Sequence, residues 1–426
     1  MPTITRPPQV TAAQTLALAT TLVLPALAEG AVIRRPLMTR LAALAGAERR
    51  AIGLLSRLRA EHGDGPLLVP VTGRRWAMVP LSSHDVRAVL ADRDFSPATK
   101  EKRGALGHFE PDAVLITPDP ELRERRRALN ERVLCSEAAR FTDEEATGPS
   151  AATGEEAGRF ARVVAEEVAT LPREGVLTWP LFHEAHWRIV RRIVLGDGAR
   201  HDVTLTRQLD RLRRDANWSY LRGQRTDVRN AFRRRLAGHL ARAEPGSLAA
   251  VLARTPAPAD VNAEGQVPHW LFAYDAAAIG AYRALALLAA HPGPLEREHL
   301  RAAMLESLRL WPTTLAILRE ATGPTRWNLP EGTTAIIYSP YVNRAEPGDA
   351  YRPELWLGGG EGWAGVPFSA GFGRCAGQDL VLDTAATLLG AFLRERSVRP
   401  SVRLEDPVPA SLDHFRLRFA VKAAER

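Results

Sequence analysis

Cysteine is scarce in this chain, whose 426 residues include only Cys135 and Cys375. Two cysteines are too few for a disulfide-stapled scaffold or a cysteine-cluster metal site, so each must be interpreted alone. Linkers rich in serine, glycine or proline are also missing, although the chain is long enough for several domains of roughly 100–200 residues. We therefore predict a single domain over residues 1–426, with residues 1–30 as a flexible lead-in.

Lysine is nearly absent as well. Of the 57 basic residues, Lys100, Lys102 and Lys422 are the lysines and the other 54 are arginines, against 49 acidic residues, which gives a formal net charge of +8. A basic chain is a candidate for nucleic-acid binding, because clustered cations release counterions from phosphates. Here the arginines alternate with acids, as in residues 121–125, and no nucleic-acid-binding motif is present. We expect no nucleic-acid partner.

Charge is missing from residues 7–28, which follow Arg6 and end in Ala-Leu-Ala, as the apolar part of a secretory signal does. However, the stretch contains four threonines, two glutamines and Pro25, and a single arginine is a weak cationic start. A membrane-spanning helix needs about 20 strongly apolar residues. Secretion remains the alternative, and we expect a cytoplasmic protein without stable membrane association.

The spacing of apolar residues predicts a mainly α-helical fold with minor β structure, as one large helical domain with a small β region near the N-terminus. Apolar residues recur every three to four positions in seven segments. Helices are predicted over residues 119–134, 157–171, 184–195, 204–241, 268–290, 296–310 and 376–394.

The N-terminal β region is predicted from two short apolar runs, residues 66–71 and 76–79, which flank Thr72-Gly73 as a hairpin would. Ser83 is expected to cap a following helix that continues through Leu90. Further short β runs are expected within 314–342, and surface loops over 143–155 and 255–267.

The most informative stretch is residues 368–377, Phe-Ser-Ala-Gly-Phe-Gly-Arg-Cys-Ala-Gly, a glycine-rich loop that leads Cys375 into an apolar helix. Glycines let a backbone turn tightly and approach a flat ligand, and a helix N-terminus favours thiolate over thiol. Such a loop can present a sulfur ligand to iron. A buried cysteine at an ordinary helix start is the alternative interpretation.

This loop resembles the signature of the cytochrome P450 family, F-x-x-G-x-x-x-C-x-G. The matching positions are Phe368, Gly371, Cys375 and Gly377. A second family element, E-x-x-R, occurs at Glu306 and Arg309, which share one helix face and can form a buried structural pair. Further stretches resemble family landmarks in the family's order, at residues 319–320, 329–332, 341–344 and 351–354. The resemblance covers most of the chain and implies the cytochrome P450 fold.

The resemblance also implies a cofactor, haem b (heme b, iron protoporphyrin IX), with Cys375 as the iron ligand. Arg126 lies on a stripe of buried residues in the helix over 119–134 and matches the family's propionate-binding arginine, and Arg319 is a second candidate. An exposed arginine is the alternative for each. The loop residues expected to contact the cofactor are Phe368, Gly371, Arg374 and Gly377.

The predicted helix over 268–290 resembles the long helix that crosses the haem on its substrate side. Most family members have an acid followed by a threonine there, which help to deliver protons to oxygen. The family spacing places the acid at Asp275 and the alcohol at Ala276, and another register places the alcohol at Ala281, so the hydroxyl is missing in both. Asp275 as a structural acid paired with an arginine is the alternative.

Two other positions depart from the family pattern. The family usually has arginine or histidine two residues before the cysteine, where this chain has Gly373, with Arg374 following. The Pro-Glu-Arg landmark that completes the network of the E-x-x-R pair ends in Leu355, so its third partner is absent or is replaced by Arg352.

The resemblance implies a soluble bacterial haem-thiolate enzyme that oxidises a small apolar molecule, most simply by hydroxylation. Electrons would come from a ferredoxin and an NAD(P)H-dependent reductase. A peroxide-driven or radical-coupling enzyme is the first alternative, and a haem carrier or sensor without turnover is the second. Phe109 and Tyr274 are assigned to the substrate pocket by position alone.

Overall fold

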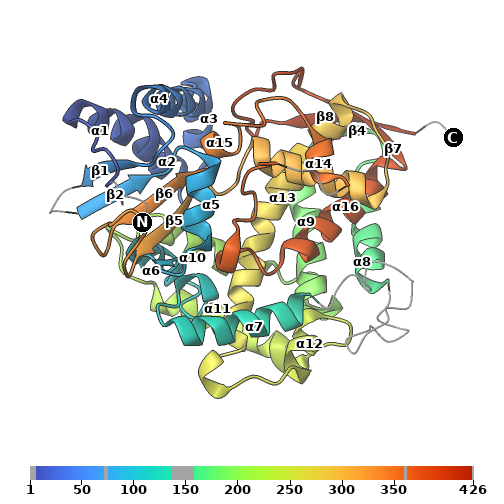
Figure 1. Cartoon of the computed structure of the whole chain (residues 1–426). Coiled ribbons are helices and arrows are strands. Elements are labelled where there is room, and N and C mark those ends of the chain that lie inside the picture. The colour runs from blue at the N-terminus through green and yellow to red at the C-terminus, as the bar shows by residue number, and fades with distance from the viewer. Residues whose placement is uncertain (1–5, 72–74, 136–157, 359–361, 425–426) are drawn as a thin grey trace.

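The computed structural model describes residues 6–71, 75–135, 158–358 and 362–424. Figure 1 shows helices making up most of the molecule, with a small sheet at one side. The expected class, mainly α with minor β, is therefore confirmed. The principal helices are α1 Ala12–Leu18, η1 Ala19–Val23, α2 Leu24–Glu29, α3 Pro36–Leu44, α4 Ala47–His62, α5 Ser83–Ala91, α6 Lys100–Leu106, α7 Pro120–Leu134, α8 Arg159–Val168, α9 Trp179–Leu195, α10 Val203–Ala216, α11 Thr226–Arg242, α12 Leu248–Arg254, α13 Val267–Ala290, α14 Arg297–Leu310, α15 Ser339–Val342 and α16 Gln378–Leu393.

The strands form two sheets, with orders β1-β2-β6-β5-β3 and β4-β8-β7. The strands are β1 Leu67–Val71, β2 Arg75–Val79, β3 Phe95–Ser96, β4 Gly175–Thr178, β5 Ala316–Ala321, β6 Thr334–Tyr338, β7 Arg396–Pro400 and β8 Arg418–Ala423. β1 and β2 pair antiparallel, so the predicted hairpin strands are confirmed. The turn residues themselves lie outside the described part of the chain.

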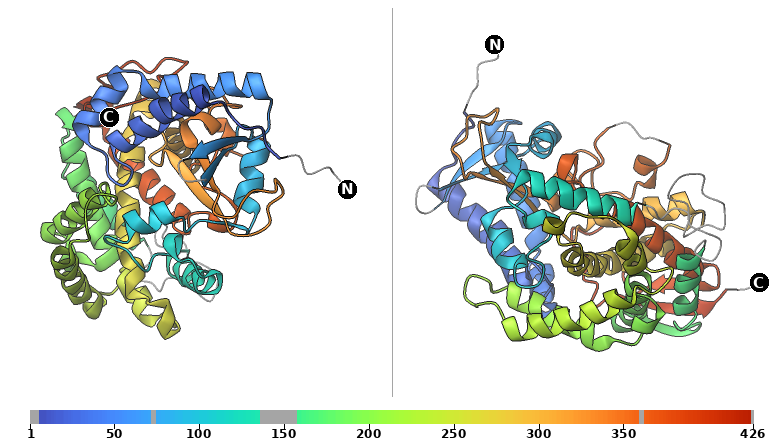
Figure 2. Two further views of the ribbon diagram at one scale, coloured as in Figure 1. Left: turned by 90° about the vertical axis from the view of Figure 1, so that its left-hand side faces the viewer. Right: turned by 90° about the horizontal axis from the view of Figure 1, so that it is seen from below.

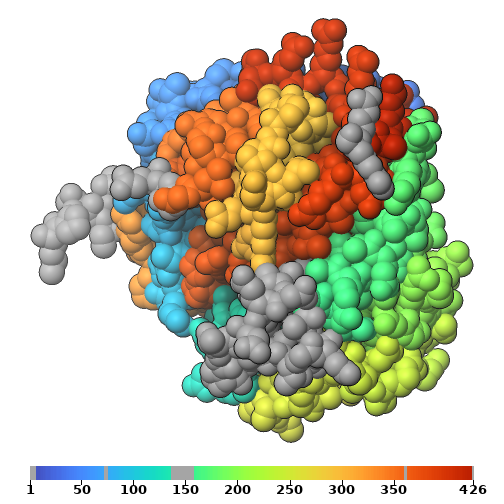
Figure 3. All heavy atoms as spheres, turned by 90° about the vertical axis from the view of Figure 1, so that its right-hand side faces the viewer, coloured from blue at the N-terminus to red at the C-terminus, as the bar shows by residue number. Residues whose placement is uncertain are grey.

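Helix α13 crosses the middle of the molecule, in contact with α9, α14 and α16 (Figure 2). Its residues are apolar on almost every side, which is the pattern of a helix enclosed by others. Gly280 lets α14 approach closely, because a side-chain carbon there would lie 2.7 Å from Met304 Cε. On the face shown in Figure 3, α16 lies between α14 and α8.

The N-terminal segment differs from the flexible lead-in that we expected. Residues 12–29 form the continuous helical run α1, η1 and α2, which starts at a capping box between Thr11 and Gln14. Leu18 and Leu22 are buried in the hydrophobic cluster around the five-stranded sheet. Residues 12–29 are thus helical and partly packed against the sheet, because the leucines of this segment bury part of its surface.

Two further expectations need correction. The predicted helix over 204–241 is two helices, α10 and α11, because Asn217 uses its side-chain amide to bind the backbone of Val32 and Ile33 at the point where α10 ends. The cap of α5 is Ser82, one residue before the predicted Ser83; its hydroxyl accepts from the amide of Asp85.

The predicted surface loop over 255–267 contains two short helical turns, and Val261 and Gln266 within it are buried. The loop expected over 143–155 lies outside the described residues. By length and composition, residues 12–29 and the helical stretch 259–290 are long and apolar enough to cross a membrane. The second stretch is mostly buried in the core, whereas 17% of the first is buried.

The predicted pair on α14 is fully buried. Glu306 and Arg309 form two charge-assisted hydrogen bonds of 2.6 and 2.8 Å, and neither side chain is exposed. The Arg309 guanidinium also donates to the carbonyls of Asn343, Gly348 and Ala350. The pair thereby fastens residues 343–350 to α14.

The third partner of this pair is a tryptophan. The Trp356 indole donates to Glu306 Oε1 at 2.8 Å, and the main-chain amide of Arg352 donates to Oε2 at 2.7 Å. The Arg352 side chain pairs instead with exposed Glu354. Arg352 therefore contributes its backbone, and the position expected for an arginine side chain is served by an indole N–H.

We predict that Glu306→Ala lowers the free energy of unfolding by about 3–5 kcal/mol, because it leaves the Arg309 charge buried without its partner. Glu298→Ala is the matched control on the same helix, since Glu298 is exposed. Thermal and denaturant unfolding of both variants provide the measurement. Equal stability of the two variants would contradict the structural role of the pair.

Candidate active site

The loop before α16 is held in one conformation by backbone contacts. The Cys375 amide donates to the Phe368 carbonyl at 3.0 Å, which closes the loop. Gly371 has a φ of +62°, and a side-chain carbon there would lie 2.1 Å from the Leu90 carbonyl oxygen at the end of α5. The chain needs glycine at this position both for the left-handed conformation and for the close approach to α5.

Cys375 is half-buried at the end of this loop. Burial raises the pKa of the Cys375 thiol, and the amide of Gly377 and the charges of Arg127 and Arg374 only partly offset it. A coordinated metal cation would favour the thiolate, because a ligating thiol is deprotonated by the metal charge.

One face of α13 is accessible although the rest of its middle part is buried. Between residues 270 and 282, the half-buried residues are Phe272, Ala273 and Ala276, which lie on one face at helical spacing. On the loop, Phe372 and Cys375 are half-buried as well. Phe272 on the helix and Phe368 on the loop border the same hydrophobic cluster. This face, with Ala276 on it, is the less buried side of α13.

Asp275 lies beside that face in a buried ion pair, and its partner Arg213 also lies over the Phe272 ring, 5.0 Å from its centre. Its carboxylate accepts from Arg213 of α10 and from His183 of α9, both at 2.7 Å, and it is buried. Burial alone would raise the pKa of Asp275, but Arg213 and His183 hold it well below its usual range. The carboxylate is thus a paired anion that joins three helices, as the structural alternative described.

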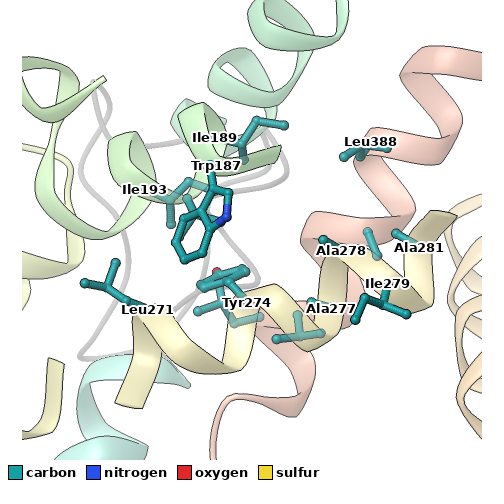
Figure 4. Close-up of a cluster of buried hydrophobic side chains, with 14 of the residues drawn as sticks. Trp187, Ile189, Ile193, Leu271, Tyr274, Ala277, Ala278, Ile279, Ala281 and Leu388 are labelled. Carbon is teal, nitrogen blue, oxygen red and sulfur yellow. The ribbon is translucent and has the colours of Figure 1, made fainter. Parts of the chain in front are cut away.

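The two positions assigned to the substrate pocket lie on different sides of α13. Phe109 packs edge-to-face on Phe272 with ring centroids 5.4 Å apart, next to the accessible face. Tyr274 is buried, and its carbonyl is 2.9 Å from His186 Nε2. Figure 4 shows Tyr274 among core residues, close to Trp187 of α9. Phe109 thus lies next to the less buried face of α13 and Tyr274 does not, and their assignment to a substrate pocket stays a prediction.

Three cations lie beside the loop without a salt-bridge partner among the described residues: Arg123 and Arg319, which are buried, and Lys102, which is half-buried. Arg319 on β5 donates to the Ser369 hydroxyl, and both Arg319 and Lys102 donate to the Leu318 carbonyl. Arg123 of α7 lies over the Phe372 ring at 5.8 Å. Burial lowers the pKa of all three groups. The positive charge of Arg319 lowers the pKa of Lys102 further, and the positive charge of Arg123 lowers the pKa of Arg319 further.

These cations have capacity for an anionic ligand. Among the described residues, none of the three forms a salt bridge, and the buried Arg319 Nε has no hydrogen-bond partner. A buried cation without an anion is unfavourable. The donor set therefore fits a ligand with carboxylates beside the cysteine loop, as the propionates of a haem would be.

Arg126, the arginine expected in this role, is committed elsewhere. It pairs with Asp112 at 3.1 Å and donates to the Thr117 hydroxyl and the Val261 carbonyl. The arginines of α7 that reach the loop are Arg123 and Arg127, and Arg127 donates to the Arg374 carbonyl at 2.7 Å. Their spacing of four residues is a sequence signal that indicates one shared helix face, and it would have identified them.

The position two residues before the cysteine is Gly373, and the structure shows why it carries no side chain. A side-chain carbon at Gly373 would lie 2.4 Å from Arg319 Nη2. Arg319 thus occupies the space that the family fills from the loop. Arg374, one residue later, is exposed and donates to the Gln378 side chain, on the outside of the loop.

Three solved structures that are similar to this one are described here, and all three are cytochromes P450. CYP102L1 superposes with a TM-score of 0.68 over 100% of both chains at 15% identity. CYP108D1 from Novosphingobium aromaticivorans gives 0.66 over 98% of this chain and 100% of that chain at 16% identity. Retinoic acid-bound cyanobacterial CYP120A1 gives a TM-score of 0.63 over 87% of this chain and 94% of that chain at 13% identity.

The chain has the cytochrome P450 fold. No protein-family model and no curated protein matches the sequence, so the likeness to P450 proteins is one of structure.

We predict a graded loss of stability for alanine at the loop glycines of this P450 fold. Gly371→Ala should cost about 3 kcal/mol, from left-handed strain plus the contact with Leu90. Gly373→Ala should cost about 1 kcal/mol, because the end of Arg319 can move. Gly377→Ala should stay within about 0.5 kcal/mol, since its nearest neighbour, Leu134, would be in ordinary contact.

Denaturant unfolding of the three variants measures this order. If Gly377→Ala proves as damaging as Gly371→Ala, the described loop geometry is not the cause of the loss.

Proposed function

We propose that this chain is a member of the cytochrome P450 family and a haem-thiolate oxidoreductase. The observation that supports the proposal is the set of two buried cations and one half-buried cation, without salt-bridge partners in the described part of the chain, beside the cysteine loop of the P450 fold. A carrier or sensor with haem but no turnover is the alternative from another functional class. An enzyme and a carrier or sensor would share this fold, so measurements of substrate turnover must distinguish the two functions.

In this proposal, haem b is held by Cys375 as the iron ligand, while Arg123, Arg319 and Lys102 neutralise its propionates. A thiolate-ligated haem supplies electron density that favours cleavage of an O–O bond. The chain itself contributes a closed loop that fixes the sulfur and a half-buried, apolar face of α13 that restricts water. Phe368 and the glycines of the loop let the backbone lie close to a flat ligand.

The substrate is proposed to be a small, largely apolar organic molecule that undergoes monooxygenation. Phe109, Phe272, Ala273 and Ala276 offer carbon surface on the accessible side of α13. The structural neighbour CYP120A1 has retinoic acid bound, which is a molecule of this class. Ala276 has no hydroxyl to deliver a proton. A peroxide-driven or radical-coupling enzyme is therefore the alternative enzymatic function.

The electron donor is proposed to be a ferredoxin served by an NAD(P)H-dependent reductase, in the cytoplasm. The outer side of the cysteine loop carries exposed Arg374, and Arg132 on α7 is exposed as well. An acidic electron-transfer protein would be attracted to this basic surface, and the attraction would weaken with salt.

We predict that Cys375→Ala abolishes the red-shifted Soret band of the dithionite-reduced, CO-bound protein, because no other anionic ligand stands in the loop. Cys135→Ala is the matched control: its sulfur lies 3.8 Å from the Ala376 carbonyl, yet it is exposed at the end of α7. This variant should keep the band. Loss of the band in both variants, or in neither, would overturn the assignment of Cys375.

We predict that Ala276→Thr raises the fraction of NAD(P)H electrons that end in product, because it restores a proton-donating hydroxyl on the accessible face of α13. Ala277→Thr is the control, since Ala277 is buried. Product per NAD(P)H consumed, with ferredoxin and reductase present, is the measurement.

A peroxide-driven enzyme would be indifferent to Ala276→Thr and would run at a comparable rate on hydrogen peroxide alone. A carrier or sensor would give no product with either source of oxidising equivalents. Either result would replace the proposed reaction.

A further inference from the structure

The exposed apolar side chains are concentrated at one end of the molecule. In the described part of the chain, 15 large apolar side chains are exposed, and ten of them fall within two short stretches, residues 16–44 and 218–221. The other five, among them Val176 and Val402, are scattered singly, as is normal for a soluble protein. Ten such side chains in two stretches indicate a surface that something covers.

The two stretches lie side by side. The Asn217 side chain accepts from the amide of Val32 at 2.8 Å and donates to the carbonyl of Ile33 at 2.8 Å. The Arg35 guanidinium lies 4.4 Å from the centre of the Trp218 ring. We call the joint area the N-terminal apolar surface. It consists of Leu16, Val23, Leu24, Leu27, Leu37, Leu41, Leu44, Trp218, Tyr220 and Leu221.

The helices of this surface are apolar on both sides. Leu18 and Leu22 of the run α1–η1–α2 face the core, whereas Leu16 and Val23 face outward. On α3, Leu37, Leu41 and Leu44 follow each other at spacings of four and three, which places them on one exposed face. A second apolar face on a folded helix lowers solubility unless it has a partner.

The charges around this surface are mostly positive, although exposed Glu61 of α4 accepts from the Gln14 side chain of α1 at 3.0 Å. Within residues 6–50, the exposed charged residues are Arg6, Arg40, Arg49 and Arg50. The two acids of this stretch are not exposed: Glu29 is buried and Glu48 is half-buried. Beside Trp218, Arg214 and Arg222 are exposed as well. Leucine surface with arginines at its rim and with exposed tryptophan and tyrosine is the composition of segments that lie in a membrane interface.

We propose that the N-terminal apolar surface binds reversibly to the surface of an anionic lipid bilayer. Residues 12–29 lie on the bilayer in this arrangement and do not cross it, because their other face is packed on the five-stranded sheet. Such contact is peripheral, which is compatible with a protein that has no stable membrane anchor. The surface lies outside the candidate active site, and the proposal does not depend on the oxidation chemistry.

Charge and apolar area favour a bilayer over a second copy of the chain. Two copies joined through this surface would bring the arginines of both rims together, and like charges in contact oppose association. An anionic leaflet attracts each of these arginines, and it accepts leucine and tryptophan side chains at the boundary of its apolar layer.

The experiment is co-sedimentation of the full-length protein with vesicles of phosphatidylcholine alone and of phosphatidylcholine mixed with phosphatidylglycerol. We expect binding to the mixed vesicles, weakening as salt is added. The double variant Leu37→Glu/Leu41→Glu should lower the affinity by about tenfold or more, because it removes two apolar contacts and adds negative charge. Val402→Glu, at an isolated exposed valine, is the matched control and should bind like the unmodified chain.

Trp218→Glu tests the second stretch independently and should also weaken binding. The thermal unfolding midpoint and the CO-bound spectrum of each variant show that the fold and the cysteine site are intact, so a failure here is distinguishable from a failure of the proposed enzyme function. Absence of binding to the mixed vesicles overturns the proposal. So does a dimer, detected by light scattering, that Leu37→Glu/Leu41→Glu dissociates, since a second copy would then be the occupant.

Discussion

The buried pair of Glu306 and Arg309 is the interaction on which the arrangement of the cysteine loop depends. The Arg309 guanidinium donates hydrogen bonds to three main-chain carbonyls within residues 343–350. The Glu306 carboxylate accepts hydrogen bonds from the Arg352 main-chain amide and from the Trp356 indole. These contacts satisfy both charges in the interior, where neither is tolerated alone. They also hold residues 343–356, which precede the cysteine loop in the chain, against α14.

Helix α13 separates two kinds of chemistry by its two sides. Asp275 faces Arg213 and His183 and is neutralised by them, so it fastens α13 to α9 and α10. Ala273 and Ala276 lie on the less buried side, and their methyl side chains are small and unreactive. Consecutive residues on a helix point about 100° apart, which is why Asp275 and Ala276 can have such different surroundings.

The parts of the site that the sequence predicted are those encoded by short spacing. The loop over 368–377 and the pair Glu306–Arg309 are local patterns, and the structure has both as expected. The cation cluster was only partly predicted, because Lys102, Arg123 and Arg319 come from three distant segments and meet only in the folded chain. Arg126 was chosen from a buried stripe, yet α7 buries both Arg123 and Arg126, and burial alone did not say which of the two meets the loop. Trp356 was missed because an arginine was expected to complete the pair, whereas any donor of suitable reach can do so.

The contact between Gly373 and Arg319 has a consequence for how this chain can change over generations. Their positions are 54 residues apart in sequence, but one volume is shared between them, so a side chain can occupy it from the loop or from β5. A side chain larger than alanine at position 373 needs the space of the Arg319 guanidinium, so it is tolerated better once Arg319 has been shortened, and the loss of Arg319 is tolerated better once a cation stands at position 373. The two sites are therefore expected to evolve as a coupled pair, in which each single step is worse than the two steps together.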